Sequence, residues 1–116
     1  MQIEVKGRNV SVTEDLREHV ERRFRKVARQ VSELARLEIE IQHERTATYP
    51  NGVVVDATLY LKGVTLRARD EAVDGMHGVN LCEEELSRQV KRHRDKRRKR
   101  RESRAASARG GVQPAL

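Results

Sequence analysis

The chain has 116 residues, of which 36% are hydrophobic, 37% charged and 3% aromatic, with a formal net charge of +7. This length predicts one domain with at most a tail, and so few aromatic residues exclude a platform that stacks several single-stranded bases. One cysteine excludes an intrachain disulfide, and no apolar run approaches the roughly 20 residues of a membrane span, so we expect a cytoplasmic protein without a membrane partner.

The first predicted elements are a strand and a helix. Residues 2–6 alternate, with Ile3 and Val5 on one face, which is typical of a half-buried strand. Thr13 occupies a helix N-cap position and is followed by two acidic residues that suit the helix dipole. A helix follows because apolar residues recur at spacings of three and four; these are Leu16, Val20, Phe24, Val27, Val31 and Leu34.

Three more strands are predicted in the middle of the chain. Residues 36–44 and 53–62 alternate between apolar and polar side chains, and a Pro-Asn-Gly turn at residues 50–52 separates them. Gly63 ends the second run, and residues 64–69 alternate again. The short connections favour a meander of antiparallel strands.

A second helix is predicted to begin between Asp70 and Asp74. Its apolar arc consists of Ala72, Met76, Val79, Cys82, Leu86, Val90 and His93. Arg, Lys and Glu are good helix formers, so the helix is able to continue into the basic residues beyond. The segment from Ser103 to Leu116 is rich in Ala, Gly and Ser and is expected to be disordered. We therefore divide the chain into a domain at residues 1–93 and a polybasic, partly disordered tail at residues 94–116.

The order of these elements predicts the fold class. It is β-α-β-β-β-α, in which each helix has one apolar stripe and the sheet has one apolar face. The economical arrangement is an α+β domain with a four-stranded sheet and two helices packed on one face. This arrangement is similar to that of a double-stranded-RNA-binding domain.

Positive charge is concentrated near the C-terminus. Residues 88–109 include twelve basic and two acidic residues, a net charge of +10, whereas the remaining 13 basic and 16 acidic residues give −3. A solvated helix face would mix the two signs, so this basic segment indicates a polyanionic partner, of which nucleic acid is the densest. The segment has no apolar face, which argues against a membrane-surface helix.

Basic residues outside this segment either bind a polyanion or simply form ion pairs on the surface of the protein. The basic stripe of the first helix comprises Arg22, Lys26 and Arg29. Glu18 and Glu33 each lie four residues from a member of this stripe and could pair with it on a solvated face. Arg67 and Arg69 share one face of a strand, where a cross-strand acid such as Asp56 could pair with them.

No pattern of residues indicates catalysis or a metal. The four histidines are scattered, and none has a metal-binding spacing with Cys82, which lies on an apolar stripe as a small core residue. Gly75 and Gly78 fall inside a helix pattern and not in a phosphate-binding loop. We therefore expect no catalytic residue, metal, cofactor or small-molecule substrate.

Three stretches together resemble the ribosome hibernation-promoting factors, also called ribosome-associated inhibitors, in their short form. Residues 1–23 contain MQIEVKGRN, then VTEDLREHV and an Arg-Arg pair. Residues 59–68 read LYLKGVTLRA. Residues 74–93 contain VNL and LSRQVKRH, similar to the Leu-x-Arg-Gln-Leu-x-Lys pattern that ends the second family helix. The resemblance covers residues 1–95 and implies the same β-α-β-β-β-α fold.

The chain also departs from the family pattern. The stretch GMHGVN at residues 75–80 replaces the usual Met-Tyr-Ala-Ala-Ile-Asp, and Glu83 stands where the family prefers an aliphatic residue. The basic run at residues 94–104 is denser than in short members. Longer members carry a second, dimerising domain, and we expect no such C-terminal dimerisation domain here.

The resemblance implies a non-enzymatic inhibitor of translation. Its partner would be the small ribosomal subunit and its rRNA, where it would occupy the mRNA and tRNA channel and hold idle ribosomes inactive under stress or in stationary phase. The implied RNA-binding residues are Arg22, Arg23, Lys26, Arg67, Arg69, Arg88, Lys91, Arg92 and His93, with Lys96 in the basic segment. The alternatives are a general RNA- or DNA-binding module without ribosome specificity and a scaffold that binds an acidic protein.

Overall fold

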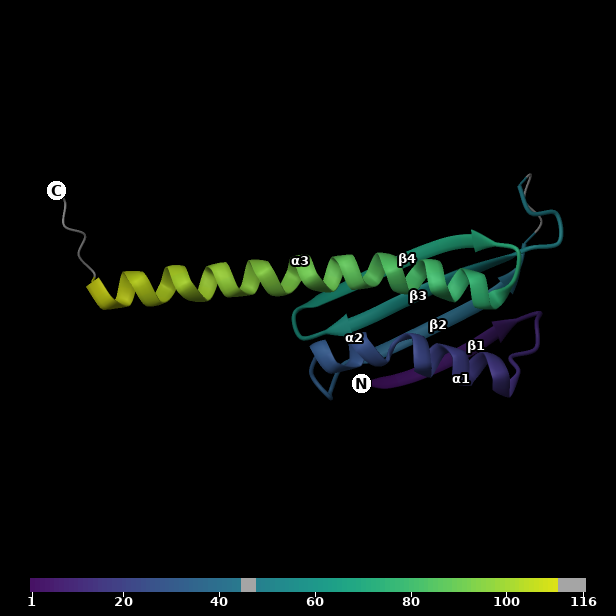
Figure 1. Cartoon of the computed structure of the whole chain (residues 1–116), viewed down its shortest axis with the longest axis horizontal. Helices are drawn as coiled ribbons and strands as arrows, with labels where there is room; N and C mark the ends of the chain where they lie inside the picture. The colour runs from purple at the N-terminus through teal and green to yellow at the C-terminus, as the bar shows by residue number, and fades with distance from the viewer. Residues whose placement is uncertain (45–47, 111–116) are drawn as a thin grey trace.

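The computed structural model describes residues 1–44 and 48–110, with side chains to residue 106. Over this part of the chain, a four-stranded sheet carries three helices on one face (Figure 1). The elements are β1 (Gln2–Arg8), α1 (Glu14–Arg23), α2 (Arg25–Gln30), β2 (Arg36–His43), β3 (Val53–Leu61), β4 (Val64–Ala72) and α3 (Gly75–Gly110). The predicted α+β class and the four-stranded sheet with helices on one face are confirmed.

The sheet has the strand order β1-β2-β3-β4. The pairs β2–β3 and β3–β4 are antiparallel, which confirms the predicted meander, and Gly63 with φ 80° makes the tight turn between β3 and β4. The edge strand β1 is parallel to β2, with Ile3 opposite Leu37. This parallel pair is possible because α1 and α2 form the crossover connection between the two strands.

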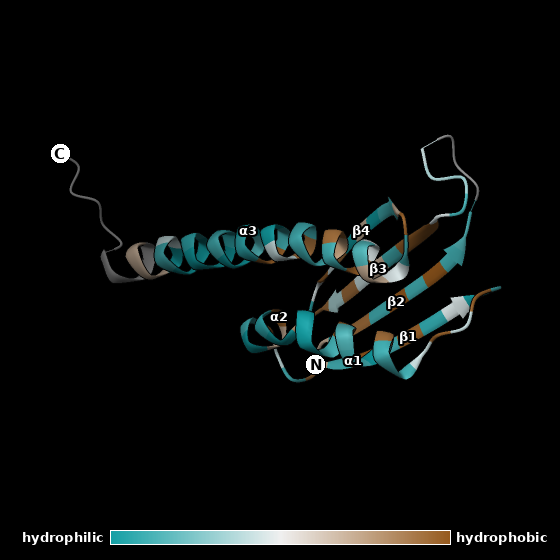
Figure 2. Cartoon of the chain, turned by 45° about the vertical axis from the view of Figure 1, so that its right-hand side comes forward, coloured by the Kyte–Doolittle hydropathy of each residue, from teal (hydrophilic) through white to brown (hydrophobic). Residues whose placement is uncertain are grey.

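The core lies between the sheet and the helices. Alternating residues of the strands face it, as the banding of hydrophobic and hydrophilic residues along the arrows shows (Figure 2). The helices contribute residues from the predicted apolar stripes, including the only Phe. The largest fully buried side chains are Phe24, Leu37, Ile39, Leu59, Leu86, Val20, Val27, Val54, Val55, Val79, Val90 and Cys82.

The first predicted helix is divided in two at Phe24. The Phe24 N–H donates to the Val20 carbonyl at 2.9 Å, and the Phe24 carbonyl accepts from the Ala28 N–H at 2.9 Å. The Phe24 backbone itself has φ −91° and ψ 6°, which is outside the regular helical range. The chain therefore bends over its most buried aromatic ring while both flanking hydrogen bonds persist.

The prediction that Leu34 belongs to the buried stripe is wrong. Helix α2 ends at Gln30, and Leu34 is 90% exposed. The reason is a local turn, in which the Ser32 hydroxyl accepts from the Leu34 N–H at 3.1 Å and the Ser32 carbonyl accepts from the Ala35 N–H at 3.0 Å. Hydroxyl turns of this kind compete with helix continuation.

Asp74 caps the start of α3. Its side chain accepts from the His77 N–H at 2.9 Å, so the helix begins at the late end of the predicted range. Met76, in the first turn, is 39% exposed and does not join the core as predicted. Gly78 is buried, and a Cβ atom there would lie 2.4 Å from Val55 Cγ2, so glycine permits the close approach of α3 to β3.

Helix α3 has 36 residues, which corresponds to about 54 Å, and it projects well beyond the sheet (Figures 1 and 2). We call residues 94–110 the α3 extension. Disorder was expected from Ser103, but the structure is helical to Gly110, in keeping with the helix propensity of Arg and Ala. Residues 111–116 lie outside the described part, and the division at residue 93 stays a prediction. None of the described helices is long and apolar enough to span a membrane.

Candidate nucleic-acid interface

Most cations on the outer face of the sheet are already neutralised; Arg67 is exposed and makes no ion pair with a described residue. Arg69 lies 3.1 Å from the Asp56 carboxylate and 3.5 Å from that of Glu44, so it makes the cross-strand ion pair that the structural alternative expects. Other pairs on this face are Lys6–Glu4, Arg8–Glu40 and Arg36–Glu38, at 3.5–3.8 Å. This face therefore has little free positive charge to offer a polyanion.

Two predicted RNA-binding residues of α1 are also paired within the chain. Arg23 Nε lies 2.9 Å from Glu83, and Arg23 Nη2 lies 3.3 Å from Glu84, so this side chain joins α1 to α3. The Glu83 carboxylate is further held by the Ser87 hydroxyl. Glu83, which departs from the family pattern, is thus the partner of a half-buried arginine. Arg22 lies 3.9 Å from Glu18, one turn earlier on α1.

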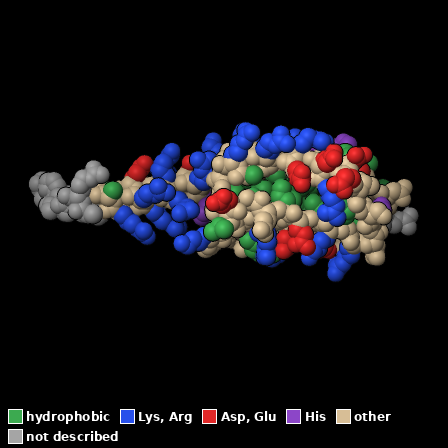
Figure 3. Space-filling model, turned by 90° about the horizontal axis from the view of Figure 1, so that it is seen from below, with side chains coloured by type: hydrophobic (Ala, Val, Ile, Leu, Met, Phe, Trp, Pro, Cys, Tyr) green, Lys and Arg blue, Asp and Glu red, His purple; other side chains and the backbone are tan. Residues whose placement is uncertain are grey.

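Free cations gather where α2 faces α3. An open groove of about 910 Å³ runs between these helices and along the α3 extension. We call it the basic groove. Its lining residues are Lys26, Gln30, Ser87, Arg88, Lys91, Arg94, Asp95, Arg97, Arg98, Arg101, Glu102 and Ala105. In space-filling view, Lys and Arg side chains crowd the α3 extension, whereas on the body acidic side chains stand among them (Figure 3).

The charge of the groove is barely opposed. Its two carboxylates, Asp95 and Glu102, both pair with Arg98, at 3.8 and 4.0 Å. The groove cations that make no ion pair with any described residue are Lys26, Arg88, Lys91, Arg94, Arg97 and Arg101. Unpaired, exposed cations along a concave track are the arrangement that phosphate binding requires.

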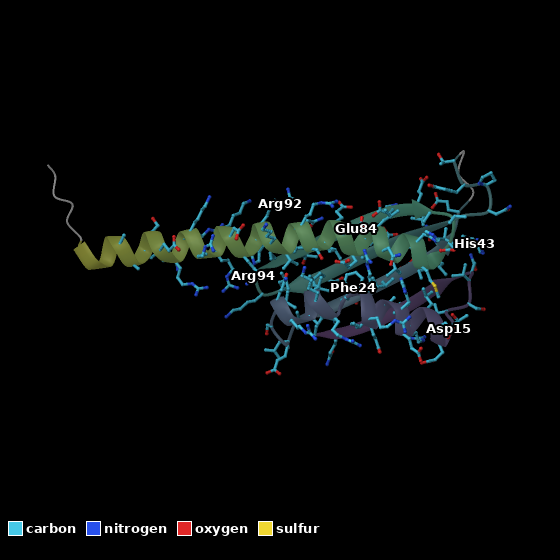
Figure 4. All side chains as sticks on the ribbon, in the orientation of Figure 1. Asp15, Phe24, His43, Glu84, Arg92 and Arg94 are labelled. Atoms are coloured by element: carbon cyan, nitrogen blue, oxygen red, sulfur yellow. The ribbon has the colours of Figure 1, made fainter. Side chains whose placement is uncertain are left out.

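The structure brings together only some of the predicted site residues. Lys26, Arg88 and Lys91 share the basic groove. Arg92 points from the side of α3 opposite Arg94 (Figure 4). The remaining predicted residues lie elsewhere: Arg67 and Lys96 are exposed outside the groove, His93 lines a different cavity, and Arg22, Arg23 and Arg69 are ion-paired.

Four groove cations do not stand out as individual candidates in the sequence. These are Arg94, Arg97, Arg98 and Arg101, which belong to the basic segment. A signal for them exists in the chain, because positions 91, 94, 98 and 101 share one helix face at the period of 3.6. Extending the stripe from Lys91 past the end of the apolar arc finds Arg94, Arg98 and Arg101.

The only cysteine of the sequence, Cys82, lies in the core and does not line the basic groove. The Cys82 thiol is buried, and its Sγ lies 3.4 Å from the Val55 carbonyl oxygen. Burial, as the main cause, and the nearby Asp70 carboxylate, as the second, raise the pKa of this thiol far above its ordinary value. A protonated, buried thiol is a poor nucleophile. Within the described residues, no three His, Cys, Asp or Glu side chains are grouped as metal ligands would be.

The chain is similar to known proteins in sequence and in fold. The chain is 30% identical over 95 residues to the ribosome hibernation promotion factor of Staphylococcus aureus (strain COL), which covers 81% of this chain and 48% of that protein. The chain thus spans about half the length of this relative. The fold matches the Thermus thermophilus Protein Y N-terminal domain, with a TM-score of 0.67, 22% identity, and coverage of 80% of this chain and 99% of that domain.

A second structure, a ribosomal subunit interface protein from Coxiella burnetii, has a TM-score of 0.69 and 23% identity, with coverage of 82% and 99%. Both matches confirm the predicted fold, while the likeness to a double-stranded-RNA-binding domain stays a prediction. The family model described as Sigma 54 modulation protein / S30EA ribosomal protein matches residues 3–98. The resemblance seen in the sequence is therefore confirmed, and the chain belongs to this family of ribosome-associated proteins.

Proposed function

We propose that this chain binds the rRNA of the small ribosomal subunit in the cytoplasm and inhibits translation without catalysis. It would occupy the mRNA and tRNA channel and hold idle ribosomes inactive under stress or in stationary phase. Family membership and the name of the S. aureus relative support a ribosomal partner. The observation that carries the proposal is the basic groove, because six of its seven cations are unpaired among the described residues, whereas most cations of the outer sheet face are paired.

The proposed mechanism is steric and electrostatic. The groove cations would bind phosphates, which fix the position of the protein but read no sequence. The body, with helices on one side and an ion-paired sheet face on the other, would then fill space that mRNA or tRNA needs. No chemical step is required, because exclusion of the substrates is sufficient to stop translation.

A general RNA- or DNA-binding role is the second candidate. The family match ends at residue 98, but the α3 extension adds Lys99, Arg100, Arg101 and Arg104 beyond it. Such cations raise affinity for any phosphate backbone, whatever its sequence or shape. This candidate expects equal affinity for ribosomes and for an unrelated RNA of similar length.

The test is sucrose-gradient sedimentation with purified ribosomal subunits, combined with translation in vitro. The wild-type protein should sediment with the small subunit at moderate salt and inhibit translation. The variant Arg88→Glu with Lys91→Glu should lose both properties, whereas Lys6→Glu with Arg8→Glu, which reverses two ion-paired cations, should keep them. Full inhibition by the folded groove variant would contradict the mechanism, and equal competition by unrelated RNA would favour the second candidate.

A further inference from the structure

A separate cavity opens where α3 leaves the end of the sheet. Its volume is about 730 Å³, within the range of pockets that hold small ligands. We call it the end pocket. Its walls come from the α2–β2 loop, the end of β3 with the following turn, and one face of α3. The lining residues are Gln2, Gln30, Val31, Ser32, Leu34, Ala35, Arg36, Tyr60, Leu61, Lys62, Val90, His93, Arg94 and Arg97.

The end pocket combines an apolar surface with a cationic rim. Val31, Leu61 and Leu34 supply the apolar part, and Leu34 is 90% exposed although nothing in the local turn requires an apolar residue. The cations are Arg36, Lys62, Arg94 and Arg97. Arg36 pairs with Glu38 at 3.8 Å, but none of the described residues lining the pocket is itself Asp or Glu. A ligand that fits this chemistry has a flat or apolar part and a negative charge.

Arg36 is arranged for stacking. Its guanidinium carbon lies 4.5 Å from the centre of the Tyr60 ring, and the Tyr60 hydroxyl donates to Glu38 at 3.3 Å, which fixes the ring. A guanidinium already stacked on an aromatic ring is held flat and presents its second face for another planar group. Nucleobases stack on guanidinium planes in this way.

We propose that the end pocket binds one unpaired RNA nucleotide. The base would lie against Leu34 and the plane of Arg36, and its phosphate would bind Arg94 and Arg97. A multi-base platform needs several aromatic rings, but one base needs only one stacking partner. This inference rests on the proposed function in one respect, namely that the partner is RNA.

Continuity with the basic groove favours a nucleotide over an acidic peptide. Arg94 and Arg97 line both the end pocket and the groove, so one strand could place successive phosphates along the groove and its next base in the pocket. Such a strand would have to be single at this point, because a paired base is not free to leave its stack. The expected ligand is therefore a single-stranded loop or end.

The test compares labelled hexaadenylate with an abasic oligomer that has the same phosphates, each titrated with the full chain. Leu34→Ser should weaken hexaadenylate binding at least about fivefold, the lower end for one stacked base, and leave the abasic oligomer unaffected. Arg36→Lys should do the same, because it keeps the charge and removes the plane. Leu81→Ser is the matched control, since Leu81 is also exposed, at 42%, and does not line the pocket.

Three outcomes would overturn the proposal: unchanged hexaadenylate affinity in both folded variants, equal weakening for the abasic oligomer, or stronger competition by an acidic, leucine-containing peptide. Circular dichroism should verify that each variant is folded. Ribosome sedimentation of the wild-type protein separates this proposal from the proposed function. If the protein did not sediment with ribosomes, the proposed function would be overturned, but the comparison of the two oligomers would still decide whether the end pocket accepts a base.

Discussion

Neutralising three groove cations should weaken ribosome binding in a salt-dependent way. The variant replaces Lys26, Arg88 and Lys91 with Gln; none of these side chains is ion-paired among the described residues, so no carboxylate loses a partner. Each lost phosphate contact makes the slope of log affinity against log salt shallower by about 0.7–0.9. If all three residues bind phosphate, the slope should fall by about 2–3 units. Stability should change by no more than about 0.5 kcal/mol, because the sites are exposed.

The assay is equilibrium binding of labelled protein to purified small subunits across a series of potassium chloride concentrations. A matched control replaces Lys6, Arg8 and Arg69 with Gln. It removes the same charge from the outer sheet face, where each of these three cations has an acidic neighbour. The control should keep the wild-type slope within about one unit. Parallel slopes for the wild type and the groove variant would refute the assignment of this groove as the phosphate track.

Three further outcomes test the fold. Phe24→Ala, at a fully buried ring, should cost about 3–5 kcal/mol and lower Tm by at least about 12 °C; a change within about 2 °C would contradict the packing. In urea unfolding, Gly78→Ala should lower the free energy of unfolding by about 1–3 kcal/mol, because the new Cβ would meet Val55. Gly75→Ala should leave that free energy unchanged or raise it slightly. Equal effects of the two variants would refute the close approach of α3 to β3. Asp74→Ala should cost about 0.5–1 kcal/mol. Hydrogen bonding from the His77 N–H lowers the pKa of the Asp74 carboxyl in the folded protein. The loss of stability caused by Asp74→Ala should therefore be greatest above about pH 5 and diminish as pH falls through the lowered pKa. A loss that does not change with pH would refute the cap.

Local patterns predicted much of this fold because each strand and helix has one buried face. Alternation located the four strands, and Gly63 marked the turn that its positive φ requires. The bend at Phe24 was not predictable in the same way, because the apolar spacing continues through it without interruption. Leu34 shows the limit of periodicity, since a Ser32 turn ended the helix before the last apolar position.

The site was harder to predict than the fold because pairing decides which cations are free. Arg23 is separated from Glu83 by 60 positions, and no local pattern reveals that they meet. Arg69 and Asp56 were easier, since the expected hairpin register places them opposite each other. Charge counting located the basic segment, but the position of α2 beside α3, which makes a groove, is a tertiary feature.

The length of α3 has a consequence for the timing of its own folding. In the α3 extension, Arg94, Arg97, Arg98 and Arg101 are three or four residues apart, and like charges at this spacing cost a helix about 0.2–0.5 kcal/mol per pair. Nucleation is the unfavourable step for an isolated helix, but here the buried turns of α3 supply the nucleus. Anions would then relieve the repulsion turn by turn. Helix growth and polyanion capture would become one process, in which every phosphate bound makes the next turn easier to form.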